Sequence, residues 1–206
     1  GFVDEAGSRL SPYEFQYWNN YTLSGGAQLG YNYTWSQQKG TVLAGFQYGR
    51  FIMNDTYYMI GENDKLPCYP TEDQRALLLG KESTVSGYLQ IKHNILPNLI
   101  FNGGLRFDRK YQFNGRTHNA WSPRVSLIWN PSKNINLKTC YAHSFVDAPF
   151  FYRANTTIVY PGGIGLNPET MDAIQFNFIW KSPRMGLNGE TNLFFNRFGN
   201  LITLLN

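Results

Sequence analysis

The chain has 206 residues, of which 17% are aromatic and only 16% are charged. Average globular chains carry about a quarter charged residues, so we expect something other than water to cover part of this surface. The net charge of +4 is small and the 18 lysines and arginines form no basic run, which argues against nucleic acid as a partner.

The chain shows no sign of a membrane helix or of a disulfide framework. No stretch approaches 18 consecutive apolar residues, which excludes a transmembrane helix. The N-terminal residues have neither a basic region nor an apolar core, so we expect a signal peptide to be absent or already removed. Cys68 and Cys140 fall in a predicted loop and in mid-strand, and we interpret them as two unpaired structural cysteines.

The first strand pattern runs from Thr22 to Ser36, where the odd positions are mainly apolar or aromatic and the even positions are polar or glycine. This alternation lasts about 15 residues, whereas an ordinary globular strand has about five or six. A tilted membrane strand needs about 9 to 11 residues for the hydrocarbon alone. The length therefore favours a membrane barrel over a soluble sheet.

The same alternation predicts eight strands, and the connections between them alternate between short and long. The long ones are placed at Asp55 to Ser83, Asn114 to Asn119 and Val146 to Glu169. Transmembrane barrels have short periplasmic turns and long extracellular loops, whereas a sandwich has no reason to sort its loops in this way. The predicted fold is all-β: an antiparallel transmembrane β-barrel, with about eight strands present as a segment of a larger barrel.

The tryptophans and the chain ends agree with this interpretation. Trp35, Trp129 and Trp180 fall beside short turns, and Trp18 and Trp121 lie near the opposite strand ends, as expected for aromatic girdles at the two membrane interfaces. If the short turns are periplasmic, the first strand starts outside and the eighth ends outside. Because a complete bacterial barrel keeps both ends periplasmic, we expect further strands elsewhere.

Several segments resemble the barrel of TonB-dependent outer-membrane receptors. They are Gly103 to Asp108, Ser122 to Leu127, Tyr141 to Phe145, Leu166 to Thr170, Phe194 to Arg197 and Asn200 to Ile202. Phe145 to Arg153 is similar to the Bacteroidetes-type version of the family's aromatic-and-proline loop box. In the place of the Asn-Pro-Asn-Leu motif of haem receptors the chain has Leu-Asn-Pro-Glu-Thr, which gives no support for a haem ligand.

The resemblance implies a barrel of about 22 strands around an N-terminal plug. Such a receptor sits in the outer membrane of a Gram-negative bacterium and imports a scarce small-molecule ligand, such as a siderophore, cobalamin or a glycan, with energy from the TonB system. Its partners would be outer-membrane lipid, the plug, the remaining strands and, through the plug, the TonB complex. The chain itself contains no plug, no TonB-contacting box and fewer than half of these strands.

Charged side chains are expected to point into the lumen, because a charge on the lipid face costs about 2 to 4 kcal/mol at the midplane. The set comprises Lys92, Arg106, Lys110, Arg124 and Lys138, with Asp108, Asp172 and Glu190. These residues either pair with one another and with a plug, or attract an anionic ligand such as a metal chelate. Gly103 and Gly104 remove side chains inside a strand, which permits curvature or close approach by another part of the protein.

Aromatic residues cluster in the predicted extracellular loops, where they either grip a ligand or pack against each other. Our first candidates for ligand contact are Phe151, Tyr152 and Arg153, and we add four further candidates: Tyr57, Tyr58, Arg106 and Arg124.

An enzyme is not expected. His93, His118 and His143 form no metal-binding or catalytic motif, and the chain has no nucleophile elbow or phosphate-binding loop, so we predict no catalytic residue, no metal site and no cofactor. The alternatives are a soluble β-sandwich that acts as a binding or adhesion module, and an outer-membrane barrel enzyme. If the apolar rows packed against a second layer of the same chain, the barrel interpretation would be wrong.

Overall fold

The computed structural model describes residues 2–3, 9–10, 13–61, 77–155, 163 and 165–202. Eight long strands dominate it, and a separate pair of two-residue strands, β1 (Phe2–Val3) and β2 (Arg9–Leu10), lies at the N-terminal end. One short helix, α1 (Phe150–Ala154), follows β8. The long strands are β3 (Tyr13–Trp35), β4 (Gln38–Gly61), β5 (Gly80–Leu96), β6 (Leu99–Tyr111), β7 (Thr117–Ser132), β8 (Ile135–Val146), β9 (Glu169–Ser182) and β10 (Leu187–Gly199).

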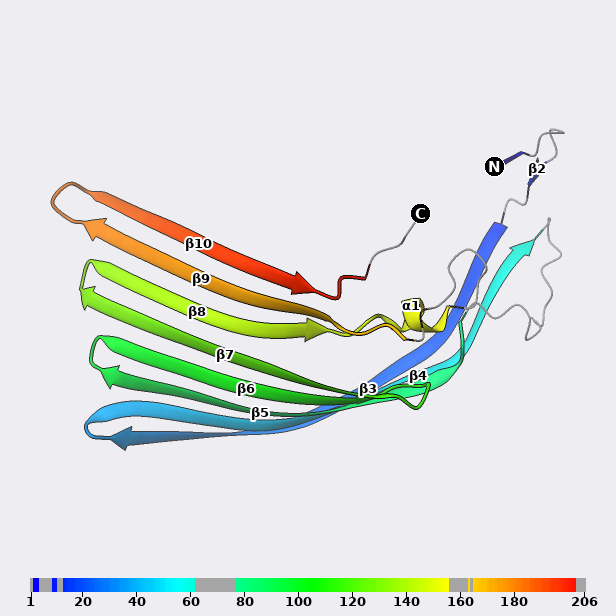
Figure 1. Ribbon diagram of the computed structural model, residues 1–206, viewed down its shortest axis with the longest axis horizontal. Helices are drawn as coiled ribbons and strands as arrows, with labels where there is room; N and C mark the ends of the chain where they lie inside the picture. The colour runs from blue at the N-terminus through cyan, green and yellow to red at the C-terminus, as the bar shows by residue number, and fades with distance from the viewer. Residues whose placement is uncertain are drawn as a thin grey trace.

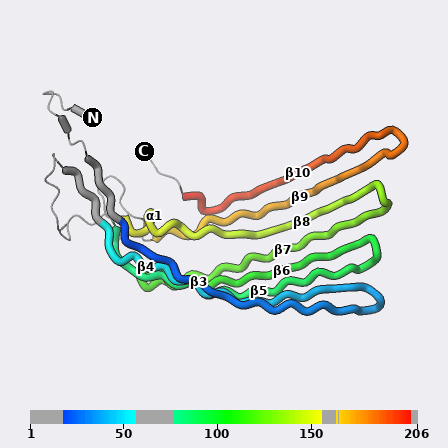
Figure 2. Tube along the Cα trace, turned by 180° about the vertical axis from the view of Figure 1, so that it is seen from behind, coloured from blue at the N-terminus to red at the C-terminus, as the bar shows by residue number. Residues whose placement is uncertain are grey.

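The eight strands form one antiparallel sheet in the order β10-β9-β8-β7-β6-β5-β4-β3, so each strand pairs with its neighbours in the sequence. The described part of this sheet is open, with β3 and β10 at its edges. Four short turns lie together at one end, and the longer connections lie with α1 at the other end (Figures 1 and 2). This arrangement confirms the predicted sorting of short and long connections.

The turn between β3 and β4 has the backbone geometry that a two-residue hairpin requires. Ser36 and Gln37 have φ values of 49° and 67°, as in the type I′ turn whose twist matches that of the flanking strands. Two other hairpins turn through Pro97–Asn98 and Lys133–Asn134, and the last turns through residues 183–186, with Gly186 at φ 64°. We define these four connections as the turn end of the sheet.

Two predicted loop boundaries were wrong, because strands extend further than the sequence pattern indicated. Strand β4 continues to Gly61, and Tyr57 and Tyr58 pair there with β3 instead of lying in a loop. The extension pairs only with β3, beyond a bulge at Asn54 where the register shifts. Strand β7 begins at Thr117, so the loop before it spans only residues 112–116.

The strand register sorts the side chains into two faces that extend across the whole sheet. One row contains Tyr31, Val42, Ile91, Gly103, Val125, Tyr141, Ile174 and Phe195. The next row, on the other side, contains Asn32, Thr41, Lys92, Asn102, Ser126, Cys140, Gln175 and Phe194. We call these sides the apolar face and the polar face, and both follow the predicted alternation.

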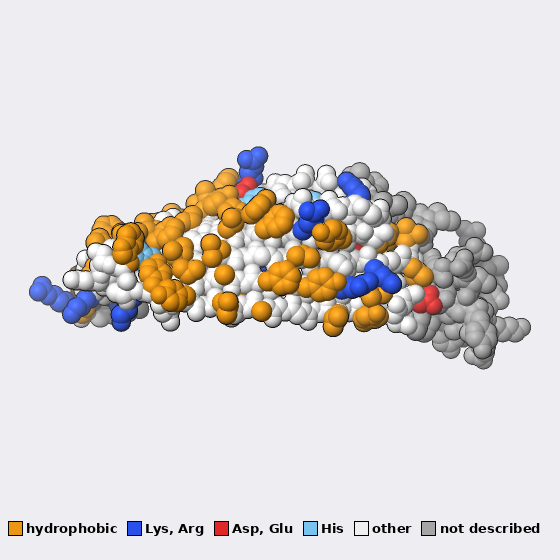
Figure 3. All heavy atoms as spheres, turned by 90° about the horizontal axis from the view of Figure 1, so that it is seen from below, with side chains coloured by type: hydrophobic (Ala, Val, Ile, Leu, Met, Phe, Trp, Pro, Cys, Tyr) orange, Lys and Arg blue, Asp and Glu red, His pale blue; other side chains and the backbone are white. Residues whose placement is uncertain are grey.

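No second layer covers the apolar face within the described residues. Leu29 is 81% exposed, Tyr31 69% and Leu193 61%, and hydrophobic side chains extend along much of the surface shown in Figure 3. The buried apolar cluster is small and lies beside α1, where Met53, Leu77 and Ala154 meet. A soluble sandwich would bury its apolar rows between two sheets, so this observation excludes a sandwich for the described part of the chain.

Glycines on the polar face let long side chains cross from one strand to the next but one. Tyr88 on β5 lies over Gly45 of β4, and its hydroxyl donates to Gln28 Oε1 on β3 at 3.0 Å. A Cβ on Gly45 would overlap the Tyr88 ring. Gly49, four residues further along the same face of β4, has no atom within 4 Å of its Cβ position.

These two glycines give a matched pair of variants. We expect Gly45→Ala to displace the Tyr88 ring and lower the free energy of unfolding by about 1 to 2 kcal/mol, as overpacking does. Gly49→Ala should leave it unchanged or raise it slightly, because alanine restricts the unfolded chain. Urea titration of the protein in detergent micelles, followed by tryptophan fluorescence, measures both. Equal midpoints for the two variants would contradict the crossing.

Candidate ligand-binding site

Arg106 is the centre of a hydrogen-bonded group in the middle of the polar face. Its Nη2 lies 2.8 Å from Asp108 Oδ1, and the guanidinium also donates to Ser86 Oγ at 2.9 Å and to Gln47 Oε1 at 2.8 Å. Asp108 is 5% exposed, so most of the charge of Arg106 is balanced by a buried carboxylate. The predicted inward position of Arg106 is confirmed, and its guanidinium is held in a fixed orientation.

Arg124 lies on the neighbouring strand β7, where it pairs with Gly104, two residues before Arg106 on β6. Its environment differs from that of Arg106. Its side chain passes over Gly104, where a Cβ would lie 2.9 Å from Nε, and its Nη2 donates to Gln90 Oε1 at 2.7 Å. The predicted close approach at Gly104 therefore exists, and the approaching group is Arg124. Within the described residues Arg124 has no ion pair, so it presents an exposed guanidinium whose charge is not neutralised by a carboxylate.

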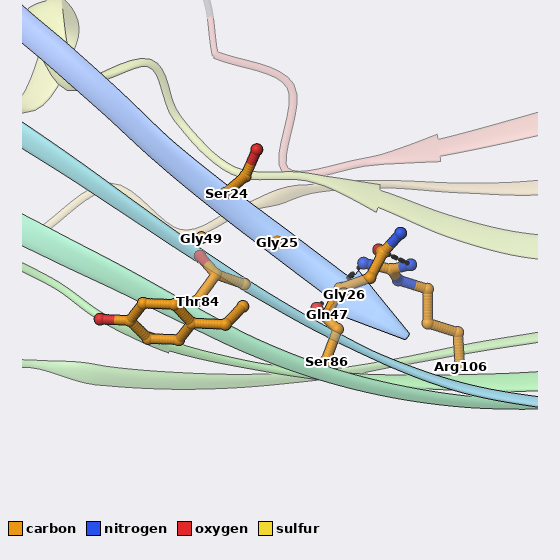
Figure 4. A pocket seen from close by; sticks show the side chains of 9 residues that line it. Ser24, Gly25, Gly26, Gln47, Gly49, Thr84, Ser86 and Arg106 are labelled. Atoms are coloured by element: carbon orange, nitrogen blue, oxygen red, sulfur yellow. Dashed lines mark hydrogen bonds between the residues drawn. The ribbon is translucent and has the colours of Figure 1, made fainter. Parts of the chain in front are cut away.

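The two arginines line one pocket of about 380 Å³, together with Gln47, Tyr88 and Ser122. A second pocket of about 490 Å³ shares Gln47 and Arg106 and extends to Ser24, Gly26 and Thr84, as Figure 4 shows. Hydroxyl, amide and guanidinium groups line both pockets, and Leu89, Leu105 and Ala142 add apolar surface to the first. Such polar groups donate hydrogen bonds to a polar or anionic molecule, which defines this stretch of the polar face as the candidate site.

The loop-box residues form helix α1, which is anchored by a buried group of four charges. The Arg153 side chain is fully buried, and its guanidinium donates to both carboxylate oxygens of Glu82 and to Ala148 O. Lys110 Nζ lies 3.0 Å from Glu82 and also contacts Asp147. Burial disfavours the charged form of Arg153, but Glu82 and Asp147 outweigh it and raise the pKa of the guanidinium above its ordinary value.

Of the other two loop-box candidates, Tyr152 is exposed and Phe151 is half-buried against the apolar cluster. Phe151 stacks on Trp18 of β3 with ring centroids 5.7 Å apart, and Tyr152, 41% exposed, meets the Phe151 ring edge-on at 5.6 Å. We call Trp18, Phe151 and Tyr152 the aromatic platform. The prediction that Trp18 belongs to a girdle on the apolar face was therefore wrong. Trp18 shares the parity of Thr22 and Ser24 on β3, which places it on the polar side beside α1.

Asp172 also differs from its predicted inward position. The register pairs it with His143 and Arg197 on the apolar face, near the end away from the short turns. His143 Nδ1 lies 2.8 Å from its Oδ1, and the Tyr141 hydroxyl donates to it at 2.9 Å. Because these partners satisfy the carboxylate and it sits near a strand end, it is tolerated on this face.

The structure brings together only some of the seven candidate residues. Arg106 and Arg124 share a pocket, and Phe151, Tyr152 and Arg153 share α1; the side chains of Tyr57 and Tyr58 lie outside the described residues. Sequence analysis missed Glu82 and Asp147, the partners of Arg153. Glu82 alternates in phase with Ser86 and Gln90 on β5, and this alternation would have predicted that Glu82 lies on the polar face.

The described residues contain neither a metal-binding cluster nor a membrane-spanning helix. No group of three or more histidine, cysteine, aspartate or glutamate side chains is arranged to hold a metal ion there. No helix in that part of the chain is long and apolar enough to cross a membrane.

The comparison with protein families decides the assignment. The model of the TonB dependent receptor-like β-barrel matches residues 2–206. The chain belongs to this family. Its members are transport receptors and not enzymes. No curated protein matches the chain.

Solved structures of the family share the fold at low sequence identity. The Serratia marcescens hemophore receptor HasR, solved with its hemophore HasA and heme, has a TM-score of 0.71 and 13% identity over 92% of this chain and 34% of its own. The siderophore receptor PirA from Acinetobacter baumannii has a TM-score of 0.62 and 16% identity, covering 96% of this chain and 30% of its own. The RagAB peptide transporter has a TM-score of 0.61 and 15% identity, covering 89% and 24%. The chain thus spans about a third or less of the length of these receptors.

Arg153 offers a test of how α1 is held. We expect Arg153→Met to leave Glu82 with Lys110 as its one remaining cationic partner and to destabilise the docked helix by about 3 kcal/mol, near the lower end of the range for breaking a buried ion pair. The Leu78 amide donates to Ala154 O at 2.7 Å, so its hydrogen exchange should accelerate by about 100-fold. Arg184→Met, in an exposed turn, is the control. Unchanged exchange at Leu78 in Arg153→Met would show that the ion pair does not hold the helix.

Proposed function

We propose that this chain forms part of the wall of an outer-membrane receptor barrel, which takes up a scarce ligand with energy delivered through TonB. The chain would contribute eight strands, a stretch of lumen wall and the α1 connection. Further strands and a plug inside the barrel would complete the receptor, and the TonB complex would supply the energy. The family assignment and the open, curved sheet support this proposal.

The observation that carries the proposal is the contrast between the two faces. The apolar face is uncovered, which suits contact with lipid, and the polar face carries an organised hydrogen-bonding surface, which suits a water-filled lumen. On β7, Trp121 and Trp129 lie on the apolar face eight residues apart, a span of about 26 Å along the strand at about 3.3 Å per residue. A strand tilt of about 35 to 45° shortens this span to roughly 20 Å along the membrane normal, which fits within an apolar band about 25 Å tall.

For the ligand we propose an anionic small molecule, such as a ferric chelate of the siderophore class. Arg124 supports this choice because its guanidinium has only the neutral amide of Gln90 as a partner. Arg106 is already paired with Asp108 and would act mainly by orienting Gln47 and Ser86. The aromatic platform at the rim would make the first contact, mainly through the exposed Tyr152, with Phe151 half-buried behind it and Arg153 fixing their position.

The similar solved structures include a hemophore receptor with heme, a siderophore receptor and a peptide transporter. Several ligand classes are therefore compatible with the family. Cobalamin and glycans remain alternatives with less support from the site, because neither needs an unneutralised guanidinium. The soluble binding module is not favoured, since no second sheet packs on the apolar rows of the described chain.

Binding assays on the complete receptor test the ligand class. A panel of ferric citrate, heme, cyanocobalamin and a neutral oligosaccharide is titrated against the wild type, Arg124→Gln and Lys133→Gln, the last being an exposed turn residue. We expect an anionic member to bind and Arg124→Gln to weaken it by about tenfold or more, because a hydrogen bond to a charged group contributes about 1.5 to 3 kcal/mol. Binding of uncharged members alone, or full affinity in Arg124→Gln, would contradict the anionic ligand.

A further inference from the structure

A tryptophan and a basic residue recur together at the turn end of the sheet. Trp35, Trp129 and Trp180 each precede a short turn, and each is followed four positions later by a cation: Lys39, Lys133 and Arg184. Three of the four described turns carry this combination. The fourth turn, at Pro97–Asn98, is flanked instead by the exposed apolar residues Ile95 and Leu96.

All three tryptophans lie on the apolar face. Trp35 shares the strand parity of Tyr31, Trp129 that of Val125 and Trp180 that of Ile174, and these three reference residues belong to the apolar row. Trp35 is 71% exposed and Trp129 45%. Indole rings prefer the boundary between hydrocarbon and head groups, so these positions mark where the apolar surface ends.

The cations lie at or beyond this boundary and have no acidic partner. Lys133 and Arg184 are turn residues, and Lys39 occupies the second pair from its turn. All three are exposed, and none makes an ion pair with another described residue. Figure 3 shows lysine and arginine side chains projecting at this end of the molecule.

The charge at this end is also one-sided. Within four positions of the described turns there are five cations, which are Lys39, Lys133, Lys138, Lys181 and Arg184, but only one carboxylate, that of Glu190. Asn177 donates to Glu190 on the polar face, away from the tryptophans. By strand register Lys39, Lys138 and Lys181 share the polar face with Glu190, whereas Lys133 and Arg184 lie in the turns between the two faces. Among the described residues, the cations nearest the tryptophans of the apolar face are therefore Lys133 and Arg184.

From this arrangement we propose that the turn end binds the phosphate groups of anionic phospholipids, with Trp129 and Trp180 seated at the acyl–head-group boundary and the turn cations Lys133 and Arg184 reaching the phosphodiesters. This inference rests on the proposed barrel, in which the apolar face meets lipid. The surface attracts anionic lipid because a basic residue close to an anionic membrane contributes favourably and a long cationic side chain extends toward the head groups. Phosphatidylglycerol is the simplest lipid of this chemistry.

The experiment uses the complete receptor, delipidated in a nonionic detergent and titrated with phosphatidylglycerol or phosphatidylcholine. Native mass spectrometry counts bound lipid, and the unfolding midpoint is recorded in parallel. The test variant is Lys133→Gln with Arg184→Gln. The matched control is Lys92→Gln with Lys138→Gln, which removes two exposed lysines from the polar face.

We expect the wild type and the control to prefer phosphatidylglycerol, and the test variant to lose at least about tenfold of that preference, since each cation is expected to contribute roughly a fivefold factor. Lys133→Arg with Arg184→Lys should retain it. Equal binding of the two lipids by the wild type, an unchanged preference in the test variant, or an equal loss in the control would each overturn the proposal. A receptor that folds without detergent or lipid would instead refute the barrel itself.

Discussion

The structure depends on a single constraint, which is that a β-sheet with one apolar face must place that face against something other than water. Among the described residues no helix or sheet covers it, and Leu29, Tyr31 and Phe195 are all more than half exposed. A face of this size would make a soluble protein aggregate. A bilayer resolves the conflict, because it accepts apolar side chains while the strand ladder satisfies the backbone groups.

The polar face follows from the same alternation but is organised differently. Apart from the small cluster beside α1, where Met53 packs, its side chains hydrogen-bond across strands, and glycines such as Gly45 and Gly104 make room for the longest of them. Such crossings fix the rotamers of Tyr88 and Arg124 without burying them. A preorganised surface of this kind loses less side-chain entropy when a ligand binds, which connects the sheet to its proposed role in uptake.

Most of the fold was predictable from the sequence because strand alternation is a local property with a period of two. The corrections have specific causes. The predicted faces of Trp18 and Asp172 were wrong because they rested on the general preferences of tryptophan and of charged residues. The alternation of β3 and β9 places Trp18 on the polar face and Asp172 on the apolar face. The extension of β4 to Gly61 was missed because the bulge at Asn54 interrupts the pattern. Glu82 and Arg153 lie 71 positions apart in the sequence, so no local sequence pattern predicts that they pair.

Fluorescence quenching in lipid vesicles tests the central claim most directly. Two single-tryptophan versions of the receptor, one retaining Trp129 and the other retaining Trp18, are reconstituted with brominated phospholipids, whose bromine atoms quench only tryptophans that touch lipid. The account predicts strong quenching of Trp129, on the apolar face, and little quenching of Trp18, which stacks on Phe151 beside α1. Equal quenching of the two, or quenching of Trp18 alone, would contradict the assignment of the apolar face to lipid.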